Sequence, residues 1–312
     1  MTAFAFVFPG QGSQSVGMLD AWGEHPAVRQ TLLEASDALD QDLTHLIHAG
    51  PKEALDLTTH TQPVMLAAGI ACYRAWLAEG GSEPAAMSGH SLGEYSALVA
   101  AGALTLADAL PLVRFRAQAM QQAVPVGAGA MAAVLGLDAA TVRAVCAEVV
   151  ARSGEVVEPA NFNDPKQTVI SGSKAGVDLA CDALKTQGAK RALLLAVSAP
   201  FHSSLMQPAA RALQERLLSV RFEAPRVPVV NNIDVAVQTE PEALRDALVR
   251  QACGPVRWVE VMQALRARGL THIVECGPGK VLGNLARRID IEWVAGSVHD
   301  PASLAETKGL LA

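Results

Sequence analysis

The stretch Gly89-His90-Ser91-Leu92-Gly93 carries a serine in the pattern Gly-x-Ser-x-Gly. This pattern is typical of a nucleophile elbow, a sharp turn that exposes a serine hydroxyl between a strand and a helix. A short apolar segment, 85–88, precedes it, and the helix-forming segment 94–101 follows it. Such a turn places the hydroxyl at a helix N-terminus, where backbone N–H groups favour developing negative charge. The sequence therefore predicts Ser91 as a nucleophile; the alternative is a glycine-rich turn that happens to contain a serine.

A second glycine-rich stretch, Gly10-Gln11-Gly12-Ser13-Gln14, follows the apolar run Phe4–Phe8. The run predicts a buried strand that ends where the glycine-rich stretch begins. α/β proteins place ligands in loops at the carboxyl ends of such strands. We therefore expect the loop at Gln11 and the N–H of Leu92 to form an oxyanion hole, although an ordinary strand-to-helix turn has the same pattern.

A serine nucleophile needs a base, and His202 is the best candidate. It follows Ser91 in the chain, as hydrolase-like order expects, and it stands between Ala199-Pro200 and a predicted helix. The aspartates between the two residues do not follow a clear strand end. We therefore expect a dyad in which a carbonyl, and not a carboxylate, orients His202.

The composition argues against several classes of function. The chain has 312 residues, of which 50% are hydrophobic and 4% aromatic, and its net charge is −6. Binding to nucleic acid or to an anionic membrane is not expected from such a chain. The five cysteines form no Cys-x-x-Cys pair and the first residues carry no basic segment, which favours a cytoplasmic protein without a signal peptide. His45 and His48 have no third ligand nearby, so we expect no metal, and the chain has no Gly-Lys-Ser/Thr phosphate loop. No cofactor is expected either.

The order of predicted elements indicates an α/β protein with a large domain over 1–124 and 199–312 and a smaller subdomain over 125–198. In the large domain we expect helical spacing over 26–48 and helices over 62–78, with Pro63 in the first turn, and over 105–122, capped by Thr105. The small subdomain is expected to alternate strands and helices over 130–135, 139–150, 168–172, 174–187 and 191–197.

Six motifs in order carry a family resemblance over essentially the whole chain. They are Gly10-Gln11-Gly12-Ser13-Gln14, Gly89-His90-Ser91-Leu92-Gly93-Glu94, Arg116, Asn161 with Asn163, Phe201-His202-Ser203, and Glu275-Cys276-Gly277-Pro278-Gly279. Together they resemble those of malonyl-CoA:acyl carrier protein transacylases. The resemblance implies an α/β-hydrolase-like large domain with a parallel sheet and an inserted ferredoxin-like subdomain. It also implies ping-pong transfer of malonyl from malonyl-CoA, a substrate, to the phosphopantetheine thiol of acyl carrier protein.

The resemblance also implies roles for individual residues. Ser91 would be the nucleophile and His202 the base, and the N–H groups of Gln11 and Leu92 would form the oxyanion hole. Arg116 would bind the malonyl carboxylate. The remaining implied roles belong to Phe201, which would crowd branched acyl groups, to Gln251, which would orient His202 through its carbonyl, and to Asn161 and Asn163, which would help hold His202 or the surroundings of the acyl chain.

Three other functions stay open at this point. A Gly-x-Ser-x-Gly esterase would have no reason for an arginine in the acyl pocket and would normally show a clear acid. A free-standing acyltransferase of a polyketide pathway would carry nearly the same motifs. A non-catalytic binding protein would have no use for a strained serine. We expect a monomer whose partners are malonyl-CoA and acyl carrier protein.

Overall fold

The computed structural model describes residues 2–312, and strand β1 stands at the centre of its larger sheet. This five-stranded sheet has the order β7-β2-β1-β8-β9, and all of its pairings are parallel. Its strands are β1 (Phe4–Phe8), β2 (Ala86–Gly89), β7 (Val229–Val230), β8 (His272–Cys276) and β9 (Val294–Val298). Because parallel strands end at the same edge, the loops after β1, β2, β7 and β8 meet there. The elbow and the loop at Gln11 are two of those loops.

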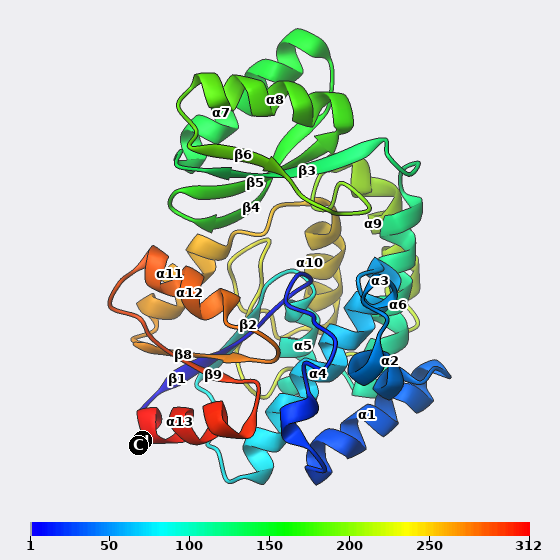
Figure 1. The fold of residues 1–312 in the computed structure, drawn as a ribbon, viewed down its shortest axis with the longest axis vertical. Helices are drawn as coiled ribbons and strands as arrows, with labels where there is room; N and C mark the ends of the chain where they lie inside the picture. Colours follow the sequence, from blue (N-terminus) through cyan, green and yellow to red (C-terminus); the bar gives the residue numbers. More distant parts are fainter. Residues whose placement is uncertain (1) are drawn as a thin grey trace.

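Helices cover both faces of the parallel sheet (Figure 1). Alternate residues of β1 point to opposite faces: Phe4, Phe6 and Phe8 enter one core, and Ala5 and Val7 enter a second. The helical elements of this part are η1 (Asp20–Trp22), α1 (Pro26–Leu39), α2 (Leu43–Ala49), α3 (Lys52–Leu55), α4 (Thr58–Ala78), α5 (Gly93–Ala100), α6 (Leu106–Gln122), η2 (Ser204–Met206), α9 (Gln207–Leu217), α10 (Pro241–Cys253), α11 (Trp258–Ala267), α12 (Val281–Ile289) and α13 (Pro301–Leu311).

Two helix predictions need correction. The helical spacing over 26–48 belongs to two helices, because Asp40 adopts a left-handed conformation with φ 47° and Asp42 caps α2 by accepting the N–H of His45. Helix α4 begins at Thr58, so Pro63 lies inside the helix and not in its first turn. The predicted cap of α6 is present, since the Thr105 side chain accepts the N–H of Asp108.

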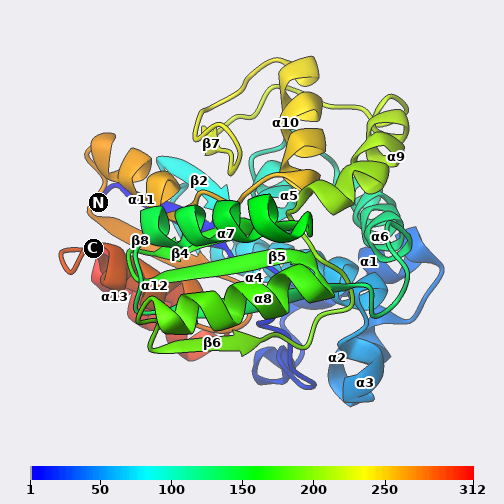
Figure 2. The same ribbon diagram turned by 90° about the horizontal axis from the view of Figure 1, so that it is seen from above.

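A smaller antiparallel sheet lies above the first (Figure 1). Its four strands have the order β4-β5-β3-β6. The elements of this part run β3 (Gly129–Leu135), α7 (Ala139–Ser153), β4 (Val157–Asp164), β5 (Gln167–Ser173), α8 (Lys174–Thr186) and β6 (Arg191–Leu194). Figures 1 and 2 show α7 and α8 on the outer face of this sheet, over a separate hydrophobic core. Strand β4 is not in the sequence prediction, and β6 is shorter than predicted.

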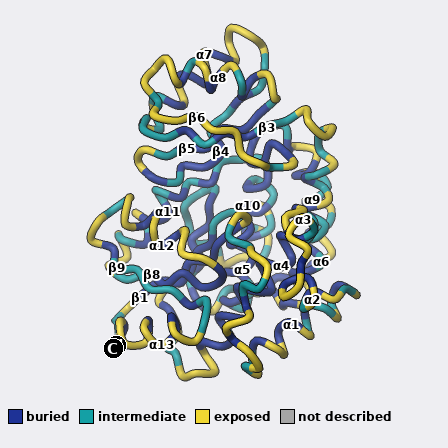
Figure 3. The backbone as a smooth tube through the Cα atoms, in the orientation of Figure 1, coloured by how far each residue is buried: buried dark blue, intermediate teal, exposed yellow. Residues whose placement is uncertain are grey.

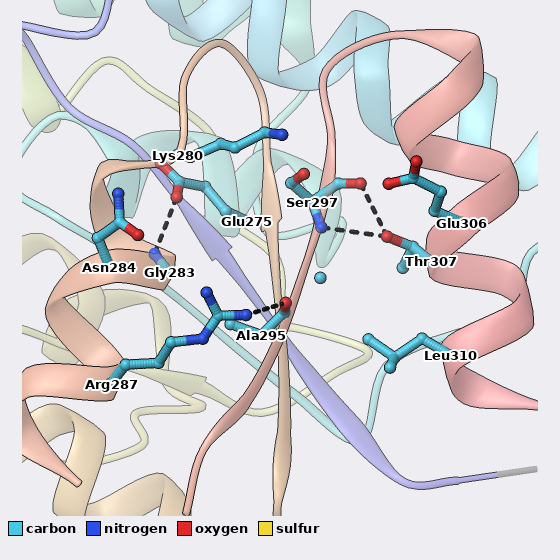
Figure 4. Close-up of a pocket in the computed structure, with 11 residues that line it drawn as sticks. Glu275, Lys280, Gly283, Asn284, Arg287, Ala295, Ser297, Glu306, Thr307 and Leu310 are labelled. Carbon is cyan, nitrogen blue, oxygen red and sulfur yellow. Dashed lines mark hydrogen bonds between the residues drawn. The ribbon is translucent and has the colours of Figure 1, made fainter. Parts of the chain in front are cut away.

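The free edge of β9 is covered by side chains from the helices beside it (Figure 4). Arg287 of α12 donates to the Ala295 carbonyl, and Thr307 of α13 bonds both the N–H and the carbonyl of Ser297. An edge strand with unpaired backbone groups is a template for aggregation. These contacts satisfy the edge and leave a cavity of about 330 Å³ between the two helices.

Burial follows the layers (Figure 3). Strands β1, β2 and β7, nearly all of β8 and most of α4 and α5 are buried. The edge strand β9 is half-buried along most of its length, and α1, α2, α7 and α8 each expose one side. Within residues 2–312, no helix combines the length and the apolar character needed to cross a membrane.

Candidate active site

Ser91 occupies the turn between β2 and α5 with φ 52°, a left-handed conformation that is strained for a serine. The flanking glycines are required by space. A Cβ on Gly89 would lie 1.9 Å from the carbonyl of Gly93, and a Cβ on Gly93 would lie 2.0 Å from the carbonyl oxygen of Phe8. The pattern Gly-x-Ser-x-Gly therefore has a steric cause in this fold.

His202 lies against the nucleophile, with its Nε2 2.7 Å from the Ser91 Oγ. Its Nδ1 is 3.0 Å from the carbonyl oxygen of Gln251 and 3.2 Å from that of Gly254. Carbonyls only accept, so Nδ1 carries the hydrogen and the free Nε2 faces the serine hydroxyl. Burial, and after it the charge of Arg116, lowers the pKa of His202 to about 3. The imidazole is therefore neutral near pH 7 and suited to accept a proton.

Arg116 of α6 lies on the other side of the nucleophile and is 2% exposed. Its guanidinium donates to the Gln62 Oε1 at 2.8 Å, to the Gln251 Oε1 at 3.1 Å and to the Ser91 Oγ at 3.2 Å. No carboxylate among residues 2–312 forms an ion pair with it. Burial lowers the pKa of Arg116, and its Nε has no partner within the described chain. A buried cation held by neutral amides is prepared to receive an anion.

Two backbone N–H groups near Ser91 are free to stabilise an oxyanion. Neither Gln11 nor Leu92 gives its N–H to an acceptor within the described part of the chain. The N–H of Ser91, in contrast, donates to the Asn232 Oδ1 at 2.7 Å. Gln11 itself is held through its side chain, which donates to the Thr58 Oγ1 at 3.2 Å.

These residues surround one cavity of about 570 Å³. Of the residues singled out in the sequence, its lining includes Gln11, Ser91, Leu92, Arg116, Asn161, Phe201 and His202. Gln251 is fully buried behind them and contacts both His202 and Arg116. The lining comes from both sheets, because Met131 of β3 and Asn161 of β4 face the same space as the elbow.

The structure brings neither predicted asparagine to His202. The Asn163 Oδ1 accepts from the Nε2 of His90 at 2.8 Å, and Asn161 lines the cavity without a side-chain hydrogen bond in the described chain. Of the two roles expected for this pair, holding His202 is therefore corrected, whereas a place in the surroundings of the acyl chain fits Asn161 alone. The carbonyls of Gln251 and Gly254 do so, and β4 contributes through its backbone, which pairs with Val256.

Three further residues were not given a role by the sequence. Gln62 holds Arg116, Asn232 bridges the elbow, and Glu94 is a buried carboxylate that accepts from the Asn232 N–H at 2.8 Å and from the Gln251 Nε2 at 2.9 Å. Burial raises the pKa of Glu94 to about 7. One signal for Asn232 lies in the fold, since it follows the short strand β7 at the sheet edge where ligands bind.

Among residues 2–312, no cluster of histidine, cysteine, aspartate and glutamate side chains has the arrangement of a metal site.

Comparison with known proteins places the chain in a family. The model described as "Acyl transferase domain" matches residues 5–288. The chain is 52% identical over 306 residues, 98% of each protein, to the malonyl CoA-acyl carrier protein transacylase of Escherichia coli (strain K12).

Solved structures agree with this result. An acyl-carrier-protein S-malonyltransferase from Burkholderia pseudomallei 1710b matches with TM-score 0.96 and 63% identity, over 98% of this chain and 99% of that one. A malonyl-transacylase solved in complex with its type II PKS acyl-carrier protein matches with TM-score 0.95 and 49% identity, over 97% and 98%. They confirm the mixed α/β architecture with one parallel and one antiparallel sheet. The chain thus belongs to the acyl transferase family, with the malonyl CoA-acyl carrier protein transacylases, as its ordered motifs predicted.

Proposed function

We propose that this protein transfers malonyl from malonyl-CoA to the phosphopantetheine thiol of acyl carrier protein by a ping-pong mechanism through malonyl-Ser91. The relatives' names give the reaction. The observation that carries it to this chain is the buried guanidinium of Arg116, 3.2 Å from the nucleophilic oxygen and without a carboxylate partner in the described chain. A malonyl group attached at Ser91 supplies that carboxylate.

In the first half-reaction the Ser91 oxygen attacks the thioester carbonyl and its proton moves to the Nε2 of His202. The carbonyl oxygen becomes an oxyanion, stabilised by the N–H groups of Gln11 and Leu92. The carbon–sulfur bond then breaks, His202 returns the proton to the departing sulfur, and free coenzyme A leaves malonyl-Ser91 behind. Arg116 holds the distal carboxylate throughout, through two parallel hydrogen bonds.

The second half-reaction reverses these roles. The thiol of the carrier loses its proton to His202 and attacks the ester carbonyl of malonyl-Ser91. The carbon–oxygen bond breaks, and the Ser91 oxygen regains the proton from His202. An esterase would instead admit water at this step, so the acceptor that takes malonyl from Ser91 distinguishes the two activities.

Polyketide carriers remain a second candidate acceptor. The observation in favour is the solved relative, 49% identical to this chain, that is in complex with a type II PKS acyl-carrier protein. The catalytic groups do not differ between the two uses, because both carriers present the same thiol. We propose fatty acid synthesis as the first assignment, since the transacylase of Escherichia coli and the malonyltransferase of Burkholderia pseudomallei, whose names mention no polyketide pathway, are more similar in sequence, at 52% and 63% identity.

We propose the same division of the chain that the sequence predicts, into 1–124 with 199–312 and an inserted 125–198. The βαββαβ order and the strand order β4-β5-β3-β6 support a ferredoxin-like insertion, and the parallel sheet with its elbow supports an α/β-hydrolase-like body. Five free cysteines support a reducing cytoplasm. We propose a monomer without a cofactor, because Ser91, His202 and Arg116 of a single chain account for every step of the transfer.

Intact mass measurement tests this function. Malonyl-CoA should add one malonyl mass to the protein, on the peptide that contains Ser91, and Ser91→Ala should remove the adduct while the fold persists. Fatty-acid and polyketide carriers, each loaded with phosphopantetheine, are then added in turn. Loss of the adduct to a carrier supports the transferase, loss to water supports an esterase, and an adduct on Cys276 or another residue contradicts the assignment.

A further inference from the structure

Asn232 lies in the loop after β7, far from Ser91 in sequence. It forms hydrogen bonds with the nucleophile and with residues on either side of it. Its Oδ1 accepts the N–H of Ser91 at 2.7 Å, and its Nδ2 donates to the carbonyl of Gly89 at 2.8 Å. Its own N–H donates to the Glu94 Oε2 at 2.8 Å. The residue is fully buried. One residue thus joins the end of β2 and the nucleophile through its side chain, and the first turn of α5 through its backbone N–H.

We propose that Asn232 is a positioning residue of the reaction, whose side-chain amide clamps the elbow. Because this amide occupies the N–H of Ser91, the oxyanion hole is formed by the N–H groups of Gln11 and Leu92. This inference rests on the proposed function. Ser91 sits at φ 52°, a conformation that persists only where its surroundings hold it. The Asn232 amide holds this conformation by accepting the N–H of Ser91 and donating to the carbonyl of Gly89, much as backbone groups of a neighbouring strand would.

A side chain of this length fits both contacts only if it offers one acceptor and one donor, as the amide does. The Ser91 N–H needs an acceptor and the Gly89 carbonyl needs a donor, and asparagine offers an oxygen and an NH₂ group on one plane. A carboxylate would meet the Gly89 carbonyl with a second acceptor. A carboxylic acid, however, carries one acceptor and one O–H donor, and therefore restores both bonds when protonated.

The clamp is joined to the base and to Arg116 through a single carboxylate oxygen. The Glu94 Oε2 that receives the Asn232 N–H also receives the Nε2 of Gln251 at 2.9 Å. The opposite side of that amide, the Gln251 Oε1, accepts from Arg116. Asn232 therefore fixes the serine within the same network that orients the guanidinium.

The chemistry of the clamp provides a test that a merely structural role would not pass. Asn232→Asp should slow Ser91 acylation at pH 8 on the order of 10- to 100-fold, because the reacting oxygen loses its position. The rate relative to the unmodified protein should recover as the pH is lowered to 5.5. The acidic groups around the new carboxyl are Glu94 of α5 and Asp234 of the next turn, which pairs with Arg250 of α10. The cations that face the same region are Arg116 of α6, which acts on Glu94, and Arg257, which donates to the carbonyl of Ile233. Burial and the two carboxylates favour the protonated form that restores the clamp.

Asn231→Asp is the matched control. The Asn231 Oδ1 accepts the N–H of Asp234, a bond that a carboxylate keeps, and its Nδ2 has no partner within the described chain. This variant should keep the pH profile of the unmodified protein. Thermal unfolding of both variants at each pH shows whether lost rate follows lost fold.

Single-turnover acylation is measured with malonyl-CoA and with p-nitrophenyl acetate, which reports the nucleophile without the malonyl contact. A pH-dependent recovery confined to Asn232→Asp, with either reagent, supports the proposal. An unchanged rate at pH 8, or an equal loss at every pH, overturns it. If the unmodified protein reacts with p-nitrophenyl acetate and not with malonyl-CoA, the proposed function fails and the clamp is still tested; reaction with neither reagent overturns both.

Discussion

Replacing Arg116 by alanine should change which thioester acylates Ser91. Malonyl differs from acetyl by a distal carboxylate, and Arg116 is the buried cation nearest the reacting oxygen, at 3.2 Å. A charge-assisted hydrogen bond contributes about 1.5–3 kcal/mol, and a buried charge without its partner costs about 3–5 kcal/mol. Exposed Gln11 lines the same cavity, so water reaches the stranded carboxylate and the lower part of these ranges applies. Acylation by malonyl-CoA should fall by roughly two to three orders of magnitude, at about 1.4 kcal/mol per factor of ten.

The assay is single-turnover acylation with malonyl-CoA and with acetyl-CoA, followed by intact mass. Acetyl-CoA leaves no carboxylate unpaired and should acylate Arg116→Ala at least as well as the unmodified protein. Arg116→Lys should recover little malonyl activity, because an ammonium cannot grip two carboxylate oxygens and both glutamine amides. Arg114→Ala is the control on the same helix, since Arg114 bonds the Leu39 carbonyl and not the site.

A second variant tests the same reasoning from the opposite direction. Gln62→Glu places a resident carboxylate where the Gln62 Oε1 now lies 2.8 Å from the guanidinium. It should suppress malonyl acylation and spare acetyl acylation, as Arg116→Ala does. If either variant loses both activities equally, Arg116 supports the fold or the oxyanion hole, and its role in substrate choice is refuted.

Three further predictions concern the base, the acyl group and the carrier. The pKa of His202 is lowered to about 3, so the base stays neutral on acidification, and single-turnover acylation should show no loss centred near the ordinary value of 6.5. His202→Ala should slow acylation by roughly 10²–10⁴-fold at pH 7. A normal rate in this variant would assign the role of base to another histidine. The unmodified enzyme should prefer malonyl-CoA over methylmalonyl-CoA, since one methyl group changes the activation free energy by about 1–3 kcal/mol, and Phe201→Ser should narrow this preference. Equal kcat/KM values for the two thioesters in the unmodified enzyme would refute the role of Phe201. Lys190, which precedes β6, and Arg288 of α12 line one cavity. Reversing both charges should raise KM for an acidic carrier and leave Ser91 acylation unchanged, and an unaltered KM would assign docking to another surface.

Local steric demands explain which parts of this molecule the sequence could predict. The elbow is one case, because Gly89 and Gly93 are required by atoms within a few residues of the turn or in the strand beside it. The cap of α6 at Thr105 is another, because its partner is three residues away. The order of six such motifs then identified the family, which the relatives confirm.

Strand β4 shows where local reasoning stops. Val157–Asp164 contains a proline, two asparagines and an aspartate, which disfavour a strand. It forms because β5 pairs with it on one side and Val256 on the other, far along the chain. The prediction therefore could not place Asn161 and Asn163, and it left open whether they hold His202 or lie in the surroundings of the acyl chain.

Long-range contacts also hid the residues that support the site. Gln62 lies in a helix that reads as an ordinary buried segment, and Asn232 follows a strand of two residues. Their partners, Arg116 and Ser91, are 54 and 141 positions away. Nothing in the residue types near Gln62 distinguishes an amide that holds a cation from one that is simply buried.

The absence of an acid beside His202 has a physical reason in the neighbouring arginine. A carboxylate that oriented His202 would lie close to the Arg116 guanidinium and would pair with it, because an unpaired buried charge is costly. Such an ion pair would compete with the malonyl carboxylate. Neutral acceptors avoid this competition: the carbonyls of Gln251 and Gly254 orient the base, and the side-chain amides of Gln62 and Gln251 orient the cation. The Ser91–His202 dyad and the choice of an anionic acyl group therefore have the same cause, a buried Arg116 whose neighbours are neutral acceptors.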